Sequence, residues 1–585
     1  MNDNEKKVDE QTVEQPEATS AETSDKAVEN TQSEVAAADA GQTAGEKKKS
    51  FLDFFKKKKK SDEATAAEAD AVSDGDSASD KSSASDNNKD AAVNSADEGE
   101  SVTAENGESS EDGSDKKKKK KRKKWKELTK EEKKKKGIKA IIITSSVVGT
   151  LLLFICICAI ISAVGTKANF EKAASVEYVG SDFTMVDEFD PMNAAQNTVG
   201  YDEELGCYTF VTDEDFVVLQ LTDIHLGAGA FSTKKDANAI SAVATLVQTV
   251  KPDLVVVTGD IAYPVVFQAG TSNNMRSAEM FAKLMNSLGV YWTITFGNHD
   301  TEAYSLYDRE DIAREVYGNP VYKRCLFSTG PSNIDGYSNH YINVQNTQGK
   351  ITQTLYMIDS HSYTDGDILG LAWKYDKIHD NQVAWYETKV ELMNQTNVDR
   401  GVSVTGDVVK SLCFFHIPLT EYSDAWNEFI KNGHKNTENV TYYYGVAGES
   451  GEKCYPGKEG GKLFDAVLEH GSTQGIFCGH DHYNTFSVEY KGVRLTYGMS
   501  IDYLAYIGIM KDTAQRGGTQ ITVSSDGSFD VTPVPYFSIK DDGSYEAAFD
   551  TQEARDALQY VKDLKWKYNA LHDETVIDQN EMNKL

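Results

Sequence analysis

The middle of the chain alternates between short apolar runs and amphipathic stretches. FVVLQLTD (216–223), DLVVVTGD (253–260) and VYWTITFGNHD (290–300) are apolar runs that end in polar residues, which is typical of buried strands. The stretches between them, 236–250 and 278–288, repeat their apolar residues with helical spacing. Strands that alternate with helices predict βαβ units and a largely parallel sheet.

The same pattern continues in the last third of the chain. SLCFFHIP (411–418) and GIFCGHDH (475–482) are two further apolar runs that end in polar residues. The segments 486–498 and 518–534 alternate apolar and polar positions around turns, which predicts antiparallel strands. We therefore expect one α/β domain over 215–535, with its ligands beyond the carboxyl ends of the strands.

A different pattern covers Ala140–Gly165, which is apolar throughout and has no charged residue. As a helix these 26 residues span about 39 Å, enough to cross a bilayer. The preceding basic juxtamembrane segment, 116–139, has 16 basic and 3 acidic residues, so the positive-inside rule places 1–139 in the cytoplasm and 166–585 outside. A cleaved signal peptide is the competing interpretation, but its n-region would exceed a hundred residues. We expect an uncleaved signal-anchor, making a single-pass protein of the cell membrane.

Composition separates the remaining parts. The chain has 585 residues and a net charge of −31, and residues 1–115 contribute 30 acidic against 13 basic residues with almost no aromatics. Such a segment cannot bury a core, so we expect a disordered acidic region there. Residues 166–214 read as a polar stalk, and 536–585 as a helical tail that docks on the domain or binds a partner. The acidic charge argues against nucleic acid as a partner.

Residues able to bind metal stand where the apolar runs end. Two of them, Asp223 and His225, are two apart and project the same way from an extended backbone, and the Asp260 carboxylate could bridge two ions about 3.5–4 Å apart. Mixed nitrogen and oxygen ligands favour Mn, Fe, Zn or Co over Mg or Ca. Two divalent ions would outweigh the two carboxylates and attract a phosphoryl group. The candidate ligands are Asp223, His225, Asp260, Asn298, His416, His480 and His482.

Together these motifs resemble the calcineurin-like metallophosphoesterases, from about residue 216 to 534. HIPLTEY (416–422), GESGEKCYP (448–456) and FCGHDHYNTF (477–486) look like the subgroup related to purple acid phosphatases, with yeast, plant and bacterial members. The resemblance implies a four-layer αββα sandwich and two metal ions. It assigns one ion to Asp223, His225, Asp260 and His482, and the other to Asp260, Asn298, His416 and His480.

The resemblance also implies a reaction, in which a metal-bound hydroxide attacks phosphorus while His299, oriented by Asp300, protonates the leaving oxygen. Tyr263 competes with His225 for one ligand position, because the purple enzymes use a tyrosine at this spacing; His225 is favoured. We expect a membrane-anchored phosphoesterase facing outward, with monoesters favoured. A phosphodiesterase or nucleotide hydrolase on the same site is the alternative, and a surface adhesion or scaffold protein with an idle domain is a third.

Overall fold

We describe a computed structural model of the chain. It covers residues 125, 128–364, 367, 372, 374–449, 451–458, 461–506, 516–540 and 542–545. The predicted disordered region (1–115), the start of the basic segment and most of the predicted C-terminal tail (536–585) lie outside the described residues.

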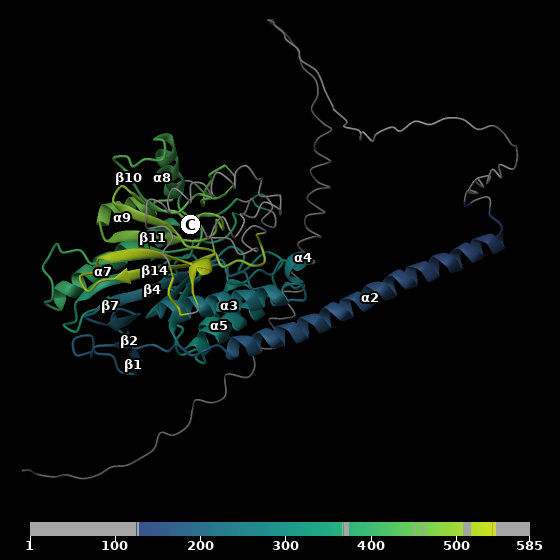
Figure 1. Cartoon of the computed structure of the whole chain (residues 1–585), viewed down its shortest axis with the longest axis horizontal. Coiled ribbons are helices and arrows are strands. Elements are labelled where there is room, and N and C mark those ends of the chain that lie inside the picture. The colour runs from purple at the N-terminus through teal and green to yellow at the C-terminus, as the bar shows by residue number, and fades with distance from the viewer. Residues whose placement is uncertain are drawn as a thin grey trace, which may run out of the picture. The chain divides into compact units, whose positions relative to one another are not determined.

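The first of two sheets has five strands in the order β15-β14-β4-β5-β6. Figure 1 shows β14 and β4 of this sheet side by side. Its strands β4, β5 and β6 are parallel, as the alternation of strands and helices predicts, whereas β14 runs antiparallel to β4 and to β15. The strands are β4 (Phe216–Leu221), β5 (Leu254–Thr258), β6 (Tyr291–Thr295), β14 (Gly517–Val523) and β15 (Phe529–Pro535).

The second sheet is mixed and has ten strands in the order β1-β2-β3-β7-β8-β9-β11-β13-β12-β10. Its centre, β8-β9-β11-β13, is parallel. The strands are β1 (Thr184–Met185), β2 (Thr198–Asp202), β3 (Cys207–Val211), β7 (His340–Gln345), β8 (Ile351–Met357), β9 (Lys410–Phe414), β10 (Val440–Tyr444), β11 (Thr473–Cys478), β12 (Ser487–Tyr490) and β13 (Val493–Tyr497).

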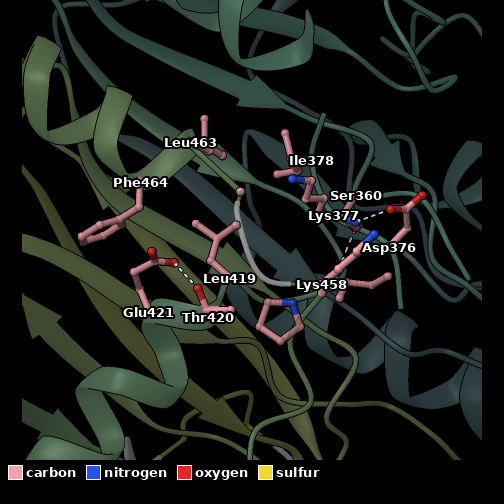
Figure 2. A pocket seen from close by; sticks show the side chains of 14 residues that line it. Ser360, Asp376, Lys377, Ile378, Leu419, Thr420, Glu421, Lys458, Leu463 and Phe464 are labelled. Atoms are coloured by element: carbon pink, nitrogen blue, oxygen red, sulfur yellow. Dashed lines mark hydrogen bonds between the residues drawn. The ribbon is translucent and has the colours of Figure 1, made fainter. Parts of the chain in front are cut away.

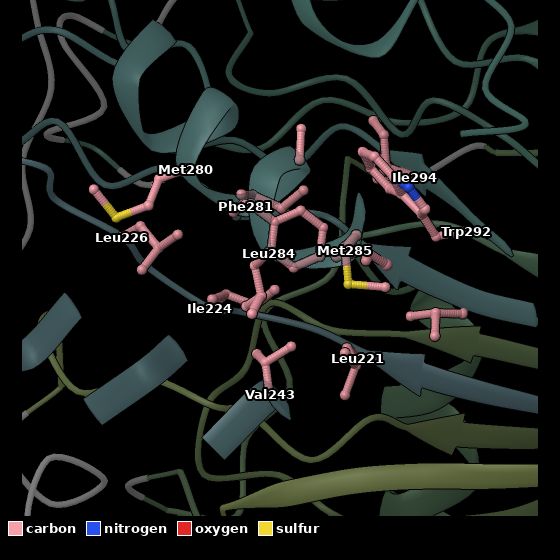
Figure 3. Packing of buried hydrophobic residues seen from close by; sticks show 14 of the residues in the cluster. Leu221, Ile224, Leu226, Val243, Met280, Phe281, Leu284, Met285, Trp292 and Ile294 are labelled. Carbon is pink, nitrogen blue, oxygen red and sulfur yellow. The ribbon is translucent and has the colours of Figure 1, made fainter. Parts of the chain in front are cut away.

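Helices cover the outer face of each sheet. On the five-stranded sheet, α3 (Thr233–Val250) and α5 (Met275–Leu288) bury Val243, Phe281 and Leu284 against β4 and β6 (Figure 3). Fully burying such a side chain stabilises the fold by about 1.5–3 kcal/mol. On the ten-stranded sheet the covering helices are α7 (Asp380–Asp399), α8 (Thr420–Lys431) and α9 (Leu463–His470).

A third set of apolar side chains fills the space between the sheets. Val218 and Val256 of the five-stranded sheet share this cluster with Leu355, Phe414 and Phe477 of the ten-stranded sheet. The order of layers is therefore helix, sheet, sheet, helix. The predicted four-layer αββα sandwich is confirmed.

The predicted apolar segment lies within one long helix, α2 (Lys130–Ala174), which begins at a capping box between Thr129 and Glu132. Its apolar side chains before Gly165 are exposed, and the helix is long and apolar enough to cross a membrane. The last turns of α2 differ: Thr166, Asn169 and Ala173 are buried against the domain.

The structure corrects the expectation of a polar stalk over 166–214. The end of α2 packs on α3 and α5, and β1, β2 and β3 extend the ten-stranded sheet, where β3 pairs in parallel with β7. These strands are short, and β2 contains Gly200. The Phe189 ring packs so closely on this glycine that a Cβ atom there would lie 2.5 Å from the ring. Because the strands are short and their apolar residues follow no clear period, the sequence pattern did not predict them.

Candidate metal centre

The predicted ligands meet where the two sheets end side by side. Asp223, Asp260 and Asn298 follow β4, β5 and β6, with His225 two residues beyond Asp223, whereas the ten-stranded sheet supplies His416 after β9 and both His480 and His482 after β11. All are buried. Glycines permit the close approach: a Cβ on Gly297 would lie 2.1 Å from Asp260 Oδ1.

Four of these residues form the first ligand group: Asp223, His225, Asp260 and His482, whose ligand atoms all lie within 4.8 Å of one another. His225 Nε2 is 3.8 Å from Asp223 Oδ1 and 3.4 Å from Asp260 Oδ2. His482 Nε2 is 3.3 Å from Asp223 Oδ1. Two carboxylates and two imidazoles therefore face one small volume.

A second group adjoins the first through Asp260. Asn298 Oδ1 lies 3.1 Å from His416 Nε2 and 2.9 Å from His480 Nδ1. His416 Nε2 is also 3.1 Å from Asp260 Oδ2. Asp260 Oδ2 therefore stands between His225 of the first group and His416 of the second, which is the position of a bridging ligand.

Unpartnered atoms test whether this arrangement suits a cation. Both ring nitrogens of His225, and Asp260 Oδ2, are buried without a hydrogen-bond partner. A buried polar atom without a partner costs about 1–3 kcal/mol, so native proteins rarely leave three together. Imidazole nitrogens and carboxylate oxygens are ligands for first-row transition metals and zinc. The residues fit a metal ion.

Backbone conformation at the centre is also unusual. Asp223, His225, Asp260 and His480 have φ between 51° and 78°, in the left-handed region that favours glycine. Holding a non-glycine residue there costs of order 1–3 kcal/mol, and it persists where the surroundings impose it. The turns after the strands therefore aim these side chains inward at a cost in stability.

The charges of the centre shift the pKa values of its members in opposite directions. Burial alone would raise the pKa of Asp260, but the neighbouring His416, His299 and His225 hold it well below its usual range. Burial alone would lower the pKa of His416, but Asp260 outweighs it and raises that pKa to about 9. The buried carboxylates thus create a negative potential that favours a cation in their midst.

Several positioning residues escaped the sequence analysis. Asp502 Oδ2 lies 3.0 Å from His482 Nδ1, and Asp502 also accepts the backbone N–H groups of 504, 505 and 506. Tyr363 Oη accepts a hydrogen bond of 3.0 Å from Asn298 Nδ2. His416 Nδ1 donates to the carbonyl of Thr258 at 2.8 Å. Neither Asp502 nor Tyr363 belongs to a strand-end motif, so no sequence signal pointed to them.

The structure corrects the partner expected for His299. The Asp300 carboxylate accepts the backbone N–H groups of Asp260, Ala262 and Gly297 at 2.8–3.1 Å. Burial and the charge of Asp260 raise the pKa of Asp300 to about 6. His299 Nδ1 instead lies 2.6 Å from Glu302 Oε1. Asp300 therefore holds the loops together, and Glu302 orients the histidine.

The structure places His225 among the converging donor atoms, whereas the hydroxyl of Tyr263 is engaged elsewhere. Tyr263 Oη donates to Gln268 Oε1 at 2.9 Å. The Tyr263 ring packs beside the His225 ring, with 4.8 Å between their centroids. Tyr263 thus supports the imidazole from the side.

Two cavities lie outside this centre. One, of about 20 Å³, is lined by Ile417, Pro418 and Lys377 among others (Figure 2). It has room for about one water molecule. The other, of about 850 Å³, is lined by residues that include Arg314, Ser328 and Tyr337. The predicted ligands line neither.

Comparisons with known proteins agree with this geometry. The family model for the calcineurin-like phosphoesterases matches residues 216–484. The chain is 30% identical over 320 residues to "Probable inactive purple acid phosphatase 14" of Arabidopsis thaliana, covering 51% of this chain and 73% of that protein.

Other similar proteins differ in what their names say of activity. "Probable inactive purple acid phosphatase 29" of the same plant is 26% identical, covering 51% of this chain and 74% of that protein. "Phosphatase DCR2" of Saccharomyces cerevisiae is 28% identical, covering 47% and 45%. A solved dimetal phosphatase from Danio rerio is 10% identical, with a TM-score of 0.36 over 55% of this chain and 97% of that one.

Proposed function

Because the chain belongs to the calcineurin-like phosphoesterase family, we propose that it is a membrane-anchored, two-metal hydrolase of phosphate monoesters that acts outside the cell. The observation that supports the proposal most is the position of Asp260 Oδ2, which lies 3.4 Å from His225 Nε2 and 3.1 Å from His416 Nε2 without a hydrogen-bond partner. A carboxylate oxygen between two ligand groups is suited to bridging two ions.

Each ligand group would hold one ion. Asp223, His225 and His482 would hold the first with Asp260, and Asn298, His416 and His480 would hold the second with the same carboxylate. The donor set suits Mn, Fe, Zn or Co. Bound ions of this kind supply Lewis acidity and lower the pKa of a coordinated water.

The chain's own residues supply the proton for the leaving group. The side chain of His299 is 22% exposed, and Glu302 engages its Nδ1. With Nδ1 engaged, Nε2 is the nitrogen that would face the substrate and protonate the departing oxygen. The backbone N–H of His299 donates to Asp260 Oδ1 at 2.8 Å, which ties the proton donor to the proposed bridging ligand.

The test uses the full chain in lipid nanodiscs with each candidate metal in turn. We expect hydrolysis of phosphate monoesters faster than of diesters or nucleotides. His299→Ala should lose about 10²–10⁴-fold in rate on an alkyl phosphate and less on an activated aryl phosphate, with its metal content intact. Equal losses on both substrates, or a metal-depleted variant, would remove His299 from this role.

The second candidate is a surface adhesion or scaffold protein with an idle domain. It is favoured by the word "inactive" in the names of the Arabidopsis relatives. The two candidates differ in one result: a metal-loaded chain that hydrolyses no phosphoester of the panel would support the idle domain. A diesterase would instead show the reversed order of rates.

The proposed orientation rests on the basic residues before the apolar part of α2. Protease added to intact cells should therefore degrade 167–585 and spare 1–139. Protection of the larger part would contradict an outward-facing domain.

A further inference from the structure

Apolar side chains are exposed on the three loops that follow β4, β5 and β6. Phe267 on α4 (Val266–Ala269) is 92% exposed, Leu306 62%, Phe231 48% and Val266 45%. We call these four residues the apolar rim. Large apolar side chains that gather on one exposed surface more often mark a site of contact with a partner or a membrane than an exposure without function.

Hydrogen bonds join the loops of the apolar rim into one surface. The backbone N–H of Phe231 donates to the carbonyl of Ala269 at 3.0 Å, and that of Leu306 donates to Ser272 at 3.0 Å. Tyr263 of the β5 loop donates to Gln268 of α4 and packs against His225. The rim is therefore built on the same loops that present the metal ligands.

The apolar rim adjoins the end of the apolar helix. Thr166 Oγ1 donates to the carbonyl of Ala228 at 3.1 Å, and Asn169 Nδ2 donates to that of Thr233 at 2.9 Å. Phe231 lies between these two acceptors in the sequence. Val164, 65% exposed, is the last exposed large apolar residue of the helix, two residues before Thr166 and so about 3 Å away along the axis.

Two lysines are exposed at this junction although the part of the chain beyond the helix is acidic. Residues 167–585 carry a net charge of −27. Beside the rim, Lys167 has a side chain 78% exposed, whose Nζ lies 3.7 Å from Glu171 Oε1. Lys234 at the start of α3 is also exposed. Aromatic side chains with lysines next to them suit the headgroup layer of a membrane that contains anionic lipids.

From this the geometry points to a membrane-contact surface: the apolar rim inserts into the headgroup layer of the same bilayer that α2 crosses. The occupant is phospholipid. The inference rests on the proposed anchoring and goes beyond it, because an anchor alone would leave the domain free of the surface. It also holds the mouth of the metal centre close to the membrane, where phosphoesters of membrane amphiphiles are presented.

Photo-crosslinking in nanodiscs of phosphatidylcholine with phosphatidylglycerol tests the contact. The full chain receives p-benzoylphenylalanine in place of Phe267 or, as a second rim position, Phe231. Leu153, 62% exposed in the apolar part of α2, is the positive control, and Val404, 68% exposed on the loop before β9, is the matched surface control. Mass spectrometry of the irradiated protein measures the fraction that carries a lipid adduct.

We expect lipid adducts at Leu153 and at both rim positions, and none at Val404. Adducts at Leu153 with the rim positions no different from Val404 would overturn the contact and leave the anchor standing. No adduct at Leu153 would overturn the anchor itself, and the contact with it.

Discussion

Histidines of the ten-stranded sheet contact the five-stranded sheet at two places, and their pKa values shift in opposite directions there. At the metal centre His416 Nε2 faces the Asp260 carboxylate at 3.1 Å, and its pKa rises to about 9. At the start of β7, His340 Nε2 lies 2.6 Å from the hydroxyl of Thr293 on β6, and burial lowers its pKa to about 4.

This difference between the two histidine contacts shows what the metal centre lacks. His340 and Thr293 satisfy each other as neutral groups, so that contact is complete within the protein. The centre instead leaves Asp260 Oδ2 and both ring nitrogens of His225 buried without a hydrogen-bond partner, and a cation bound there would satisfy them. The same imidazole group is thus a packing residue in one place and a candidate ligand in the other.

The largest effect should follow from removing the charge at the proposed bridge. Asp260→Asn should take the chain from two ions to none and reduce phosphoester hydrolysis to background, because both ligand groups share this carboxylate. Elemental analysis and rates on the same sample measure it. Asp526→Asn, at an exposed carboxylate, is the matched control and should retain both ions. An Asp260→Asn chain that keeps its metal would contradict the bridge.

A smaller effect should come from the carboxylate behind His482. Asp502→Asn keeps the Oδ1 acceptor for the backbone N–H groups of 504 and 505 but removes the charge beside His482 Nδ1, together with the Oδ2 acceptor for the N–H of 506. Partners of this kind typically contribute 10–100-fold to metal affinity, and we expect a loss of about that size in a metal titration. An unchanged metal affinity with the fold intact would reduce Asp502 to a loop-stabilising residue.

The smallest effect concerns stability at the neutral contact. The unfolded chain protonates His340 near pH 6.5, whereas the folded chain holds it neutral down to about pH 4. Between these values the unfolded state binds more protons, so this residue makes stability fall with falling pH, by at most about 3 kcal/mol.

His340→Gln should remove that part of the pH dependence, because the amide does not titrate. Denaturant unfolding of the metal-saturated protein between pH 7 and pH 4.5 measures the difference. Parallel curves for the two proteins would show that the His340 contact does not set the pH dependence of stability.

Much of the fold could be predicted from the sequence because the strands are apolar runs that end in polar residues. The apolar runs before Asp223, Asp260 and Asn298 predict parallel strands, and parallel strands place such residues at one edge. The antiparallel β14 and β15 were equally readable from their alternation. The strands β1 to β3 were not, because a few residues with a glycine among them have no clear period.

The candidate site was predicted less completely than the fold. Residues that present donor atoms stand in compact motifs, but their partners come from distant segments: Asp502 approaches His482 from a loop after β13. Glu302 was missed for a different reason. It lies three residues from His299, yet the family resemblance implied Asp300, whose carboxylate instead accepts three backbone N–H groups.

The central claim is that the two sheets hold two ions through one shared carboxylate. Metal stoichiometry of the purified full chain, beside His225→Ala and His416→Ala, tests it most directly. We predict two ions per chain in the unaltered protein and one in each variant, because each removes a ligand from a different group. An unaltered chain that holds one ion or none, or two variants that each retain both ions, would contradict it.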